Sequence, residues 1–284
     1  MSEVKFGFSR EELRTHPTVY APGLFDNHNV VVTGAGGGLG LAIAALFARL
    51  GANVAINGRN EEKLADAAAF LRGFGKKVYS RPMSIRDPEQ AALFVDEVHN
   101  EFGGLDTLVN NAGGQFPQLA LDFTVKGWNA VIDTNLNGTW WMTQAAARKW
   151  VAKSEPGSVI NIVASIWRGL PGMAHSCAAR AGVIYLSKTV AVEWAPHKIR
   201  VNCVAPGCCE STGFARYPEE GSATFQEGNP MRHAGDEWDV AEAVVYMAAP
   251  SGKFLTGEVL NVDGGQQMWG DPWPIGRPDY FKLS

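Results

Sequence analysis

Residues 33–40 read TGAGGGLG, and this stretch decides the fold of the chain. It follows an apolar run at 30–32 and precedes LAIAALFARL at 41–50, a pattern typical of a glycine turn between a buried strand and a helix. Such a turn binds phosphate, because backbone N–H groups and a helix N-terminus both attract an anion. Glycines spaced GxxxGxG allow a tight turn, a close approach of the backbone to a pyrophosphate, and close packing of helix on strand. The predicted cofactor-binding residues of this turn are Gly34, Gly36, Gly38, Leu39 and Gly40.

Further β-rich runs alternate with helical patterns along the chain. LDTLVNNAG, SVINIVAS, IRVNCVAPG and EVLNVDGG are apolar runs that end in the turn-forming residues Gly, Asn or Ser. Near-continuous apolar strands separated by helices predict an α/β fold: a single-domain, doubly wound Rossmann-type parallel sheet with helices on both faces. We expect this domain at about 28–265, with a substrate lid at about 208–237. A leader at 1–27 precedes it, and an aromatic, proline-rich tail at 266–284 is expected to fold over the body or over a neighbouring subunit.

The composition favours a small-molecule ligand. The formal net charge is −4 and no Lys/Arg run is present, which excludes the concentrated positive field that a nucleic acid or a membrane surface needs. The sequence contains neither a long apolar span nor a signal-peptide pattern, so we expect a cytoplasmic protein. Four cysteines have spacings that match neither a zinc site nor a disulfide framework, and they are interpreted as reduced thiols: Cys177, Cys203, Cys208 and Cys209.

The residues after the second expected strand bear on the choice of cofactor. A protein that binds NAD usually places an acid there for the ribose hydroxyls, but this chain reads INGRNEEKL. Arg59 stands where its planar guanidinium pairs with a 2′-phosphate, which favours NADP(H) over NAD(H). The alternative is that Arg59 is a solvated surface residue.

Five motifs occur in a fixed order. TGAGGGLG is followed by NNAGG at 110–114, NLNG at 135–138, VAPG at 204–207 and VDGG at 262–265. In these motifs the chain resembles the short-chain dehydrogenase/reductase family, over about residues 28–265. The resemblance implies an oxidoreductase with a nicotinamide dinucleotide cofactor.

The resemblance also implies roles for individual residues. Asn111 would lie beside the adenosine half of the cofactor, and Asn135 would join a hydrogen-bond relay in the active site. Ser84 stands where many members have an Asp, which leaves the adenine contact there open. The Cys209 backbone and the Ser211 hydroxyl would hold the nicotinamide carboxamide. The implied cofactor-binding residues outside the glycine turn are Asn111, Ala112, Gly113, Arg180, Pro206, Gly207, Cys209 and Ser211.

The stretch GMAHSCAARAGV at 172–183 departs from the family pattern. Most members use a Ser, a Tyr and a Lys, and the alignment on AGV puts Ser176 and Arg180 in the places of Tyr and Lys. The family serine falls on Ala164, with Ser165 one step later. Tyr185 and Lys188 do not replace the pair, because Tyr185 points about 140° away from that helix face.

Reduction of a conjugated carbon–carbon double bond suits such a site, since an enolate oxygen needs hydrogen-bond donors more than an acid. The stretch HSCAARAGV also resembles the peroxisomal trans-2-enoyl-CoA reductases and their bacterial relatives. This resemblance implies an NADPH-dependent 2-enoyl-CoA reductase, an acyl-CoA substrate and a homotetramer. Ser176 would hold the enolate oxygen, Arg180 the nicotinamide ribose, and Asn135 an ordered water.

Two alternatives stay open. One is an NADP-dependent dehydrogenase that acts on a hydroxyl or ketone with another acid, for which His175 is the candidate. The other is a non-catalytic NADPH-binding subunit. Trp167 and Arg168 are candidates for the substrate wall, and three residues of the expected lid are candidates for the CoA phosphates: Arg216, Arg232 and His233. The complete set of catalytic candidates is Ser176, Arg180, Asn135, Ser165 and His175.

Overall fold

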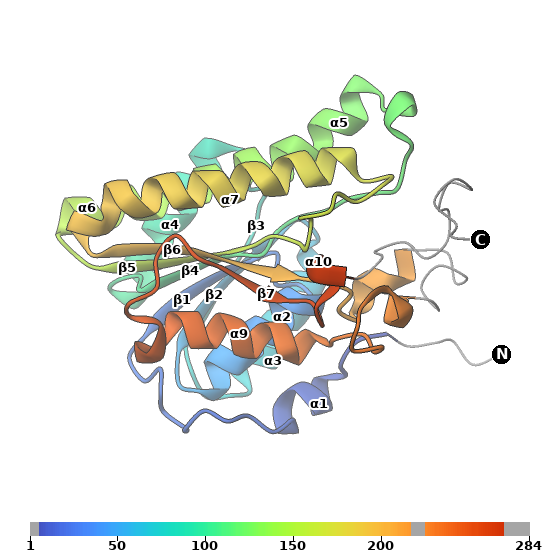
Figure 1. The fold of residues 1–284 in the computed structure, drawn as a ribbon. Helices are drawn as coiled ribbons and strands as arrows, with labels where there is room; N and C mark the ends of the chain where they lie inside the picture. Colours follow the sequence, from blue (N-terminus) through green and yellow to red (C-terminus); the bar gives the residue numbers. More distant parts are fainter. Residues whose placement is uncertain (1–5, 217–224, 270–284) are drawn as a thin grey trace.

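The computed structural model describes residues 6–216 and 225–269 (Figure 1). Its core is a seven-stranded sheet in the order β3-β2-β1-β4-β5-β6-β7, in which every neighbouring pair is parallel. The predicted doubly wound α/β fold is confirmed. The strands are β1 (Asn29–Thr33), β2 (Asn53–Gly58), β3 (Val78–Pro82), β4 (Thr107–Asn110), β5 (Gly157–Ile162), β6 (Ile199–Pro206) and β7 (Val259–Val262).

Helices cover both faces of the sheet (Figure 1). Side chains alternate between the faces of a strand, so Val30 and Val32 of β1 pack in one core and Val31 packs in the other. The first core lies under α2, α3 and α9, and the second under α4, α6 and α7. The described α-helices are α1 (Arg10–Thr15), α2 (Gly38–Arg49), α3 (Glu61–Arg72), α4 (Pro88–Phe102), α5 (Val125–Ile132), α6 (Thr139–Lys153), α7 (Ala174–Trp194), α9 (Glu237–Ala248) and α10 (Gln266–Trp269).

The strand order reverses at β1. This strand pairs with β2 on one side and with β4 on the other, so the chain crosses in opposite directions from this point. In open parallel sheets ligands bind at the carboxyl ends of the strands where the order reverses. The glycine turn that follows β1 and residues 111–114 that follow β4 meet at this edge.

The expected leader is docked on the body of the protein. Leu13 in α1 is 1% exposed, and Arg49 of α2 donates to the carbonyl oxygens of Leu13 and His16. The indole Nε1 of Trp238 donates to the carbonyl of Pro17 at 2.9 Å. Residues 6–17 are therefore packed against α2 and α9.

The expected lid and tail are described only in part. Within 208–237 the structure gives two 3₁₀ helices, η4 (Thr212–Arg216) and η5 (Phe225–Gly228), and 217–224 lie outside the described residues. Of the tail, only 266–269 are described. The predicted boundaries of the lid and tail stay predictions.

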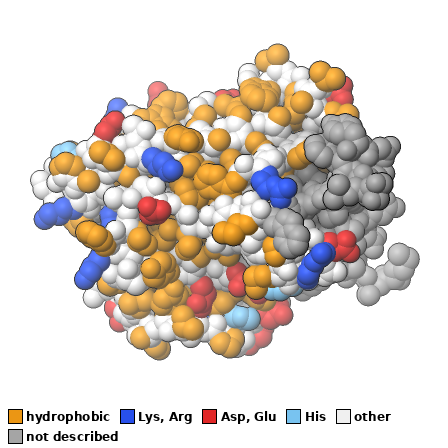
Figure 2. Space-filling view, in the orientation of Figure 1, with side chains coloured by type: hydrophobic (Ala, Val, Ile, Leu, Met, Phe, Trp, Pro, Cys, Tyr) orange, Lys and Arg blue, Asp and Glu red, His pale blue; other side chains and the backbone are white. Residues whose placement is uncertain are grey.

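Three features concern metal sites, membrane spans and basic surface patches. All four cysteines are free, and the described residues contain no His/Cys/Asp/Glu group able to hold a metal ion. None of the described helices is long and apolar enough to cross a membrane. On the face shown in Figure 2, Lys and Arg side chains lie singly among hydrophobic ones.

Candidate functional site

A groove of about 900 Å³ opens at the carboxyl ends of β1, β2 and β4. Its size is within the usual range for a small-molecule site. It is lined by all five predicted cofactor-binding residues of the glycine turn, together with Arg59, Ser84, Ser211 and the run 111–113. Neither Ser176 nor Arg180 lines this groove. The predicted adenosine and pyrophosphate residues therefore share one cavity.

Hydrogen bonds hold the glycine turn against the loop after β4. The Thr33 Oγ1 accepts from the backbone N–H groups of Asn111 and Ala112 at 3.0 and 2.9 Å. The Asn111 Nδ2 donates to the Thr33 carbonyl at 2.9 Å. Gly34 has φ +69°, and a Cβ there would lie 2.7 Å from the Cα of Ala112. The turn therefore requires a glycine at 34 both for its backbone conformation and for the close approach of the two loops.

The N-terminus of α2 faces the groove with its first N–H groups uncapped by a side chain. The residue before the helix is Gly37, which makes no side-chain cap, and Gly38 at the helix start lines the groove. The first N–H groups of a helix need an acceptor and carry a partial positive charge. This end of α2 fits a pyrophosphate.

Cationic side chains surround the adenosine end. Arg59 is exposed on the groove wall, and Lys63 of α3 lies beside the glycine turn, with its Cβ 3.7 Å from a Cβ built on Gly36. The sequence analysis predicted Arg59 for this end of the groove but did not name Lys63, which lies four residues further on. A basic residue in the first turn of α3 was the available signal.

Gly113 connects the groove to the buried catalytic candidates. It lines the groove, and a Cβ at this position would overlap the Nη2 of Arg180 and lie 3.2 Å from the Oδ1 of Asn135. Asn135 is fully buried; its Oδ1 accepts from the Gly114 N–H at 2.9 Å and its Nδ2 donates to the Gly114 carbonyl at 3.0 Å. The structure therefore brings Asn135 and Arg180 together at Gly113.

Arg180 is a buried cation. Its Nη1 donates to the Ile162 carbonyl at 2.6 Å, and no carboxylate among residues 6–216 and 225–269 forms an ion pair with it. Burial lowers the pKa of Arg180 to about 10, below the value above 12 expected from an ordinary arginine. The guanidinium is still protonated at neutral pH, so this site holds an uncompensated positive charge.

Ser176 lies one turn before Arg180 on α7. It is 1% exposed, and its Oγ donates to the Oε1 of Gln115 at 2.6 Å. Gln115 follows the run 111–114 and was missed by sequence reasoning, which had no signal for a residue outside the family motifs. Ser165 has a different partner, since its Oγ donates to the Oδ2 of Asp263 at 2.8 Å.

His175 is enclosed by aromatic rings. It is fully buried, with ring centroids 4.7 Å from Phe116 and 4.4 Å from Phe123, and its Nδ1 accepts from the Ser176 N–H. Burial lowers the pKa of His175, so the neutral form dominates at neutral pH. Tyr185 is 70% exposed on α7, in accord with its predicted direction away from Ser176 and Arg180.

The predicted nicotinamide residues follow β6. Gly207 donates to the Val262 carbonyl, which fixes this turn against β7, and Cys209 forms a β-bridge with Gly235, which precedes α9. Of the predicted set here, Ser211 lines the groove, whereas Pro206, Gly207 and Cys209 do not.

The remaining candidates are spread over the surface. The Nε1 of Trp167 donates to Asn261 at 2.8 Å, and Arg168 is exposed. Arg232 and His233 are exposed and bond to nearby carbonyls. The side chain of Arg216 lies outside the described residues. The substrate-wall and CoA-phosphate roles stay predictions.

Glu237, at the start of α9, is a groove residue that sequence reasoning missed. It is 2% exposed, accepts from the Phe8 N–H at 3.2 Å, and lies 3.7 Å from a Cβ built on Gly38. Burial raises the pKa of Glu237 to about 6. The folded state therefore binds this proton more tightly than the unfolded chain does.

This shift predicts a pH dependence of stability. The contribution of Glu237 to stability falls by about 2 kcal/mol as pH rises from about 4 to above 6, because the unfolded carboxyl ionises first. Glu237→Gln removes this titration, so we expect the variant to gain stability relative to wild type at pH 7.5 but not at pH 4. Urea unfolding of both proteins at the two pH values measures this difference. If the free energies of unfolding of the two proteins differ by the same amount at pH 7.5 and at pH 4, the raised pKa of Glu237 is contradicted.

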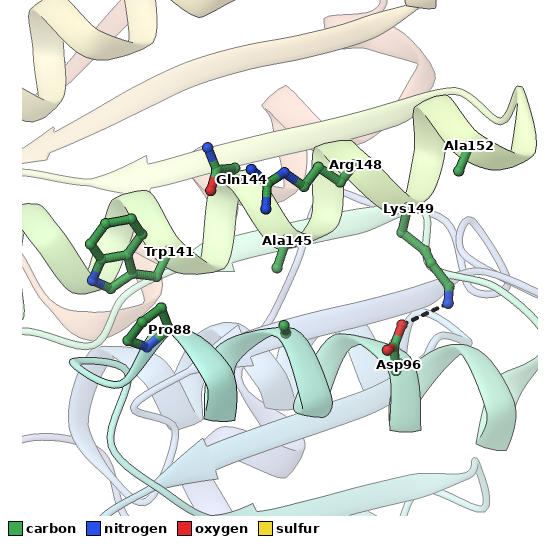
Figure 3. A pocket seen from close by; sticks show the side chains of 9 residues that line it. Pro88, Asp96, Trp141, Gln144, Ala145, Arg148, Lys149 and Ala152 are labelled. Carbon is green, nitrogen blue, oxygen red and sulfur yellow. Dashed lines mark hydrogen bonds and ion pairs between the residues drawn. The ribbon is translucent and has the colours of Figure 1, made fainter.

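A second, smaller pocket of about 280 Å³ lies between α4 and α6 (Figure 3). The Nζ of Lys149 pairs with Asp96 at 2.6 Å beside it, and Trp141 faces Pro88 at its other end. None of the predicted site residues lines this pocket, so the candidate site is the groove at the carboxyl ends of β1, β2 and β4.

The comparisons with known proteins agree with this geometry. A family model described as Enoyl-(Acyl carrier protein) reductase matches residues 34–267. The chain belongs to the short-chain dehydrogenase/reductase family. The family prediction is confirmed, and with it the class of oxidoreductase.

Two relatives and one solved structure illustrate the family. A probable 2,4-dienoyl-CoA reductase of Bacillus subtilis is 36% identical over 87% of this chain and 98% of its own length. A peroxisomal 2,4-dienoyl-CoA reductase of Arabidopsis thaliana is 34% identical over 88% of this chain and 87% of its own. The structure of a citronellol catabolism dehydrogenase of Pseudomonas aeruginosa matches with TM-score 0.79 and 35% identity, over 88% of this chain and 99% of that one.

Proposed function

We propose that this chain is an NADPH-dependent reductase of a conjugated carbon–carbon double bond in an acyl-CoA thioester. The observation that carries the proposal is the buried pair Ser176 and Arg180, one turn apart on α7, of which Arg180 contacts the groove residue Gly113. These side chains are hydrogen-bond donors at neutral pH. The names of the dienoyl-CoA reductase relatives support the same class of substrate.

The groove fits a nicotinamide dinucleotide. Gly34 and Gly38 have positive φ, the uncapped start of α2 would hold the pyrophosphate, and Arg59 with Lys63 would hold a 2′-phosphate. When bound, the reduced cofactor supplies a hydride to the acceptor. Arg180, which lies behind the groove residue Gly113, would hold the nicotinamide ribose.

The pair of donors suits an enolate. In a 2-enoyl or a 2,4-dienoyl thioester, reduction of the conjugated system gathers negative charge on the same thioester oxygen. The Oγ–H of Ser176, turned from Gln115 by rotation of one hydroxyl, would donate to this oxygen together with backbone N–H groups. Asn135 would order the water that protonates the α-carbon. These roles, like the proposed replacement of the family's Tyr and Lys, belong to the proposal.

Reduction of a ketone places a different demand on this site. A positioned acid contributes a factor of about 10² to 10⁴ to that reaction. Neither Ser176 nor Arg180, with its pKa of about 10, provides a ready acid at neutral pH. The site therefore favours double-bond reduction over ketone reduction.

A second candidate is an NADP-dependent dehydrogenase that acts on a hydroxyl. The similarity to the citronellol catabolism dehydrogenase favours it, and His175 would be its acid. The burial of His175 and its lowered pKa argue against this role at neutral pH.

We expect the purified protein to oxidise NADPH with a trans-2-enoyl-CoA or a 2,4-dienoyl-CoA, at a rate at least 100-fold above that with a 3-ketoacyl-CoA, because only the ketone needs the acid. Loss of reduced-nicotinamide absorbance measures each reaction, and citronellol with NADP⁺ provides the reverse test. Turnover of citronellol or of the ketoacyl-CoA alone would overturn the proposal. Tight NADPH binding without turnover of any of these compounds would favour the non-catalytic subunit. A homotetrameric state and a cytoplasmic location stay predictions.

A further inference from the structure

The segment of residues 6–17, which precedes the family match, forms a wall of the adenosine end of the groove. Phe8, Ser9, Arg10 and Leu13 line the groove together with Arg59 and Lys63. We propose that Arg10 is a binding residue for the 2′-phosphate of the cofactor. The proposal rests on the proposed NADP(H) dependence and adds to it a residue that lies before the family match at 34–267.

Several long-range contacts fix this segment in place. The Phe8 N–H donates to Glu237 at 3.2 Å, and the rings of Phe8 and Trp238 lie 6.4 Å apart. At its other end, Arg49 donates to the carbonyl of His16 at 2.9 Å. A wall anchored at both ends needs little reordering when a ligand binds.

The guanidinium of Arg10 is positioned but not fully bonded. Its Nη2 pairs with the Oδ2 of Asp66 at 2.5 Å, and its Cζ lies 4.8 Å from the centroid of the Phe70 ring. Its Nη1 is buried and makes no hydrogen bond within the described part of the chain. A buried donor without an acceptor is costly, and a phosphate oxygen is the acceptor that suits an arginine best. The Arg10 side chain is 37% exposed, so a rotation of its outer bonds would bring this donor to a phosphate in the groove.

The charges around Arg10 suit a phosphate. Lys63 and Asp66 lie three residues apart and share one face of α3, so Arg10, paired with Asp66, lies over the face that carries Lys63. Arg59 precedes the same helix. Three cations and one carboxylate give this end of the groove a formal charge of +2, which complements the charge of about −2 on a phosphate monoester.

The chain offers a matched control in Arg14. It lies one turn after Arg10 on the same short helix, and its Cζ is also 4.8 Å from the Phe70 centroid. Arg14 does not line the groove. Removal of Arg14 therefore tests the docking of α1, whereas removal of Arg10 tests docking and phosphate binding together.

The experiment measures the affinity of the full chain for NADPH, NADH, 2′,5′-ADP and 5′-AMP by calorimetry. We expect Arg10→Ala to lower the affinity for NADPH and 2′,5′-ADP about tenfold or more. The affinity for NADH and 5′-AMP should change less than twofold, because only the first two ligands carry the 2′-phosphate. Arg10→Lys should restore part of the loss, since it keeps the charge but not the fork. Arg14→Ala should leave all four affinities within about twofold of wild type, because it removes a contact behind the groove.

The outcomes separate this inference from the proposed function. Equal weakening of NADPH and NADH by Arg10→Ala, or no weakening of either, would overturn the role of Arg10 in phosphate binding. An equal loss in Arg14→Ala would show that Arg10 acts only by docking α1. If wild type itself binds NADH more tightly than NADPH, the proposed NADP(H) dependence fails, and the further inference fails with it.

Discussion

We expect Arg180→Ala and Arg180→Met to lose cofactor affinity and turnover together, each by about 100-fold or more, as for other buried charged donors at active sites. Arg180 is a buried cation behind the groove, and its Nη2 lies against Gly113, which lines it. Its loss removes both a positive charge and a planar fork of donors. Calorimetry with NADPH and steady-state kinetics with the best acyl-CoA substrate measure the two losses.

We expect the free energy of unfolding of these variants to change in a different way from their cofactor affinity and turnover. Burial lowers the pKa of Arg180 to about 10, which means that the surroundings disfavour the charged form. Replacing a buried charge with an apolar side chain of similar length is often neutral or stabilising, although the Ile162 carbonyl loses its donor. We therefore expect the free energy of unfolding of Arg180→Met to equal that of wild type within about 1 kcal/mol or to exceed it. Arg180→Ala should have a lower free energy of unfolding, because it leaves a cavity.

Arg180→Lys is the matched control. It keeps the positive charge but not the planar donor fork, so we expect it to retain more cofactor affinity than Arg180→Met. Unchanged kinetics in Arg180→Met would remove Arg180 from the mechanism. A loss of stability that parallels the loss of affinity would make its role structural.

The fold was predictable because local signals agreed with each other. The apolar run before TGAGGGLG, the glycine spacing and the turn residues after LDTLVNN and IRVNCVAP all indicate parallel strands that end at one edge. Arg59 was predicted from its place after the second expected strand and Asn111 from the family motif NNAGG, and both line the groove at the carboxyl ends of β1, β2 and β4.

The missed residues depend on contacts between distant parts of the sequence. Residues 6–17 have a polar pattern, and their place in the groove wall is set by Glu237 and Trp238, more than 200 residues away. Ser165 appeared close to the family's serine, but Asp263, 98 residues further on, accepts its hydroxyl hydrogen. The lowered pKa of Arg180 follows from burial, which a residue type alone does not reveal.

We expect Gly34→Ala to remove most cofactor binding and to lower the free energy of unfolding by about 2–4 kcal/mol. Gly34 has φ +69°, where an L-residue is strained, and its new Cβ would lie 2.7 Å from the backbone Cα of Ala112. The turn has to move away from the loop after β4. That movement disturbs the bonds from Asn111 to the Thr33 and Gly34 carbonyls, which position the start of α2. Chemical denaturation and NADPH calorimetry measure the two effects.

Gly37→Ala distinguishes a specific requirement at Gly34 from a general intolerance of this turn. Gly37 has an extended backbone with φ 172°, and a Cβ built on it has no neighbouring atom within 4 Å. We expect this variant to unfold within about 0.5 kcal/mol of wild type, as most substitutions without a packing or backbone conflict do. If Gly37→Ala destabilises the protein as much as Gly34→Ala, the turn tolerates no side chain at either position, and the close approach of the two loops is not what requires Gly34. If neither variant is destabilised, the loop after β4 is free to move, and the groove does not depend on the contact between Gly34 and Ala112.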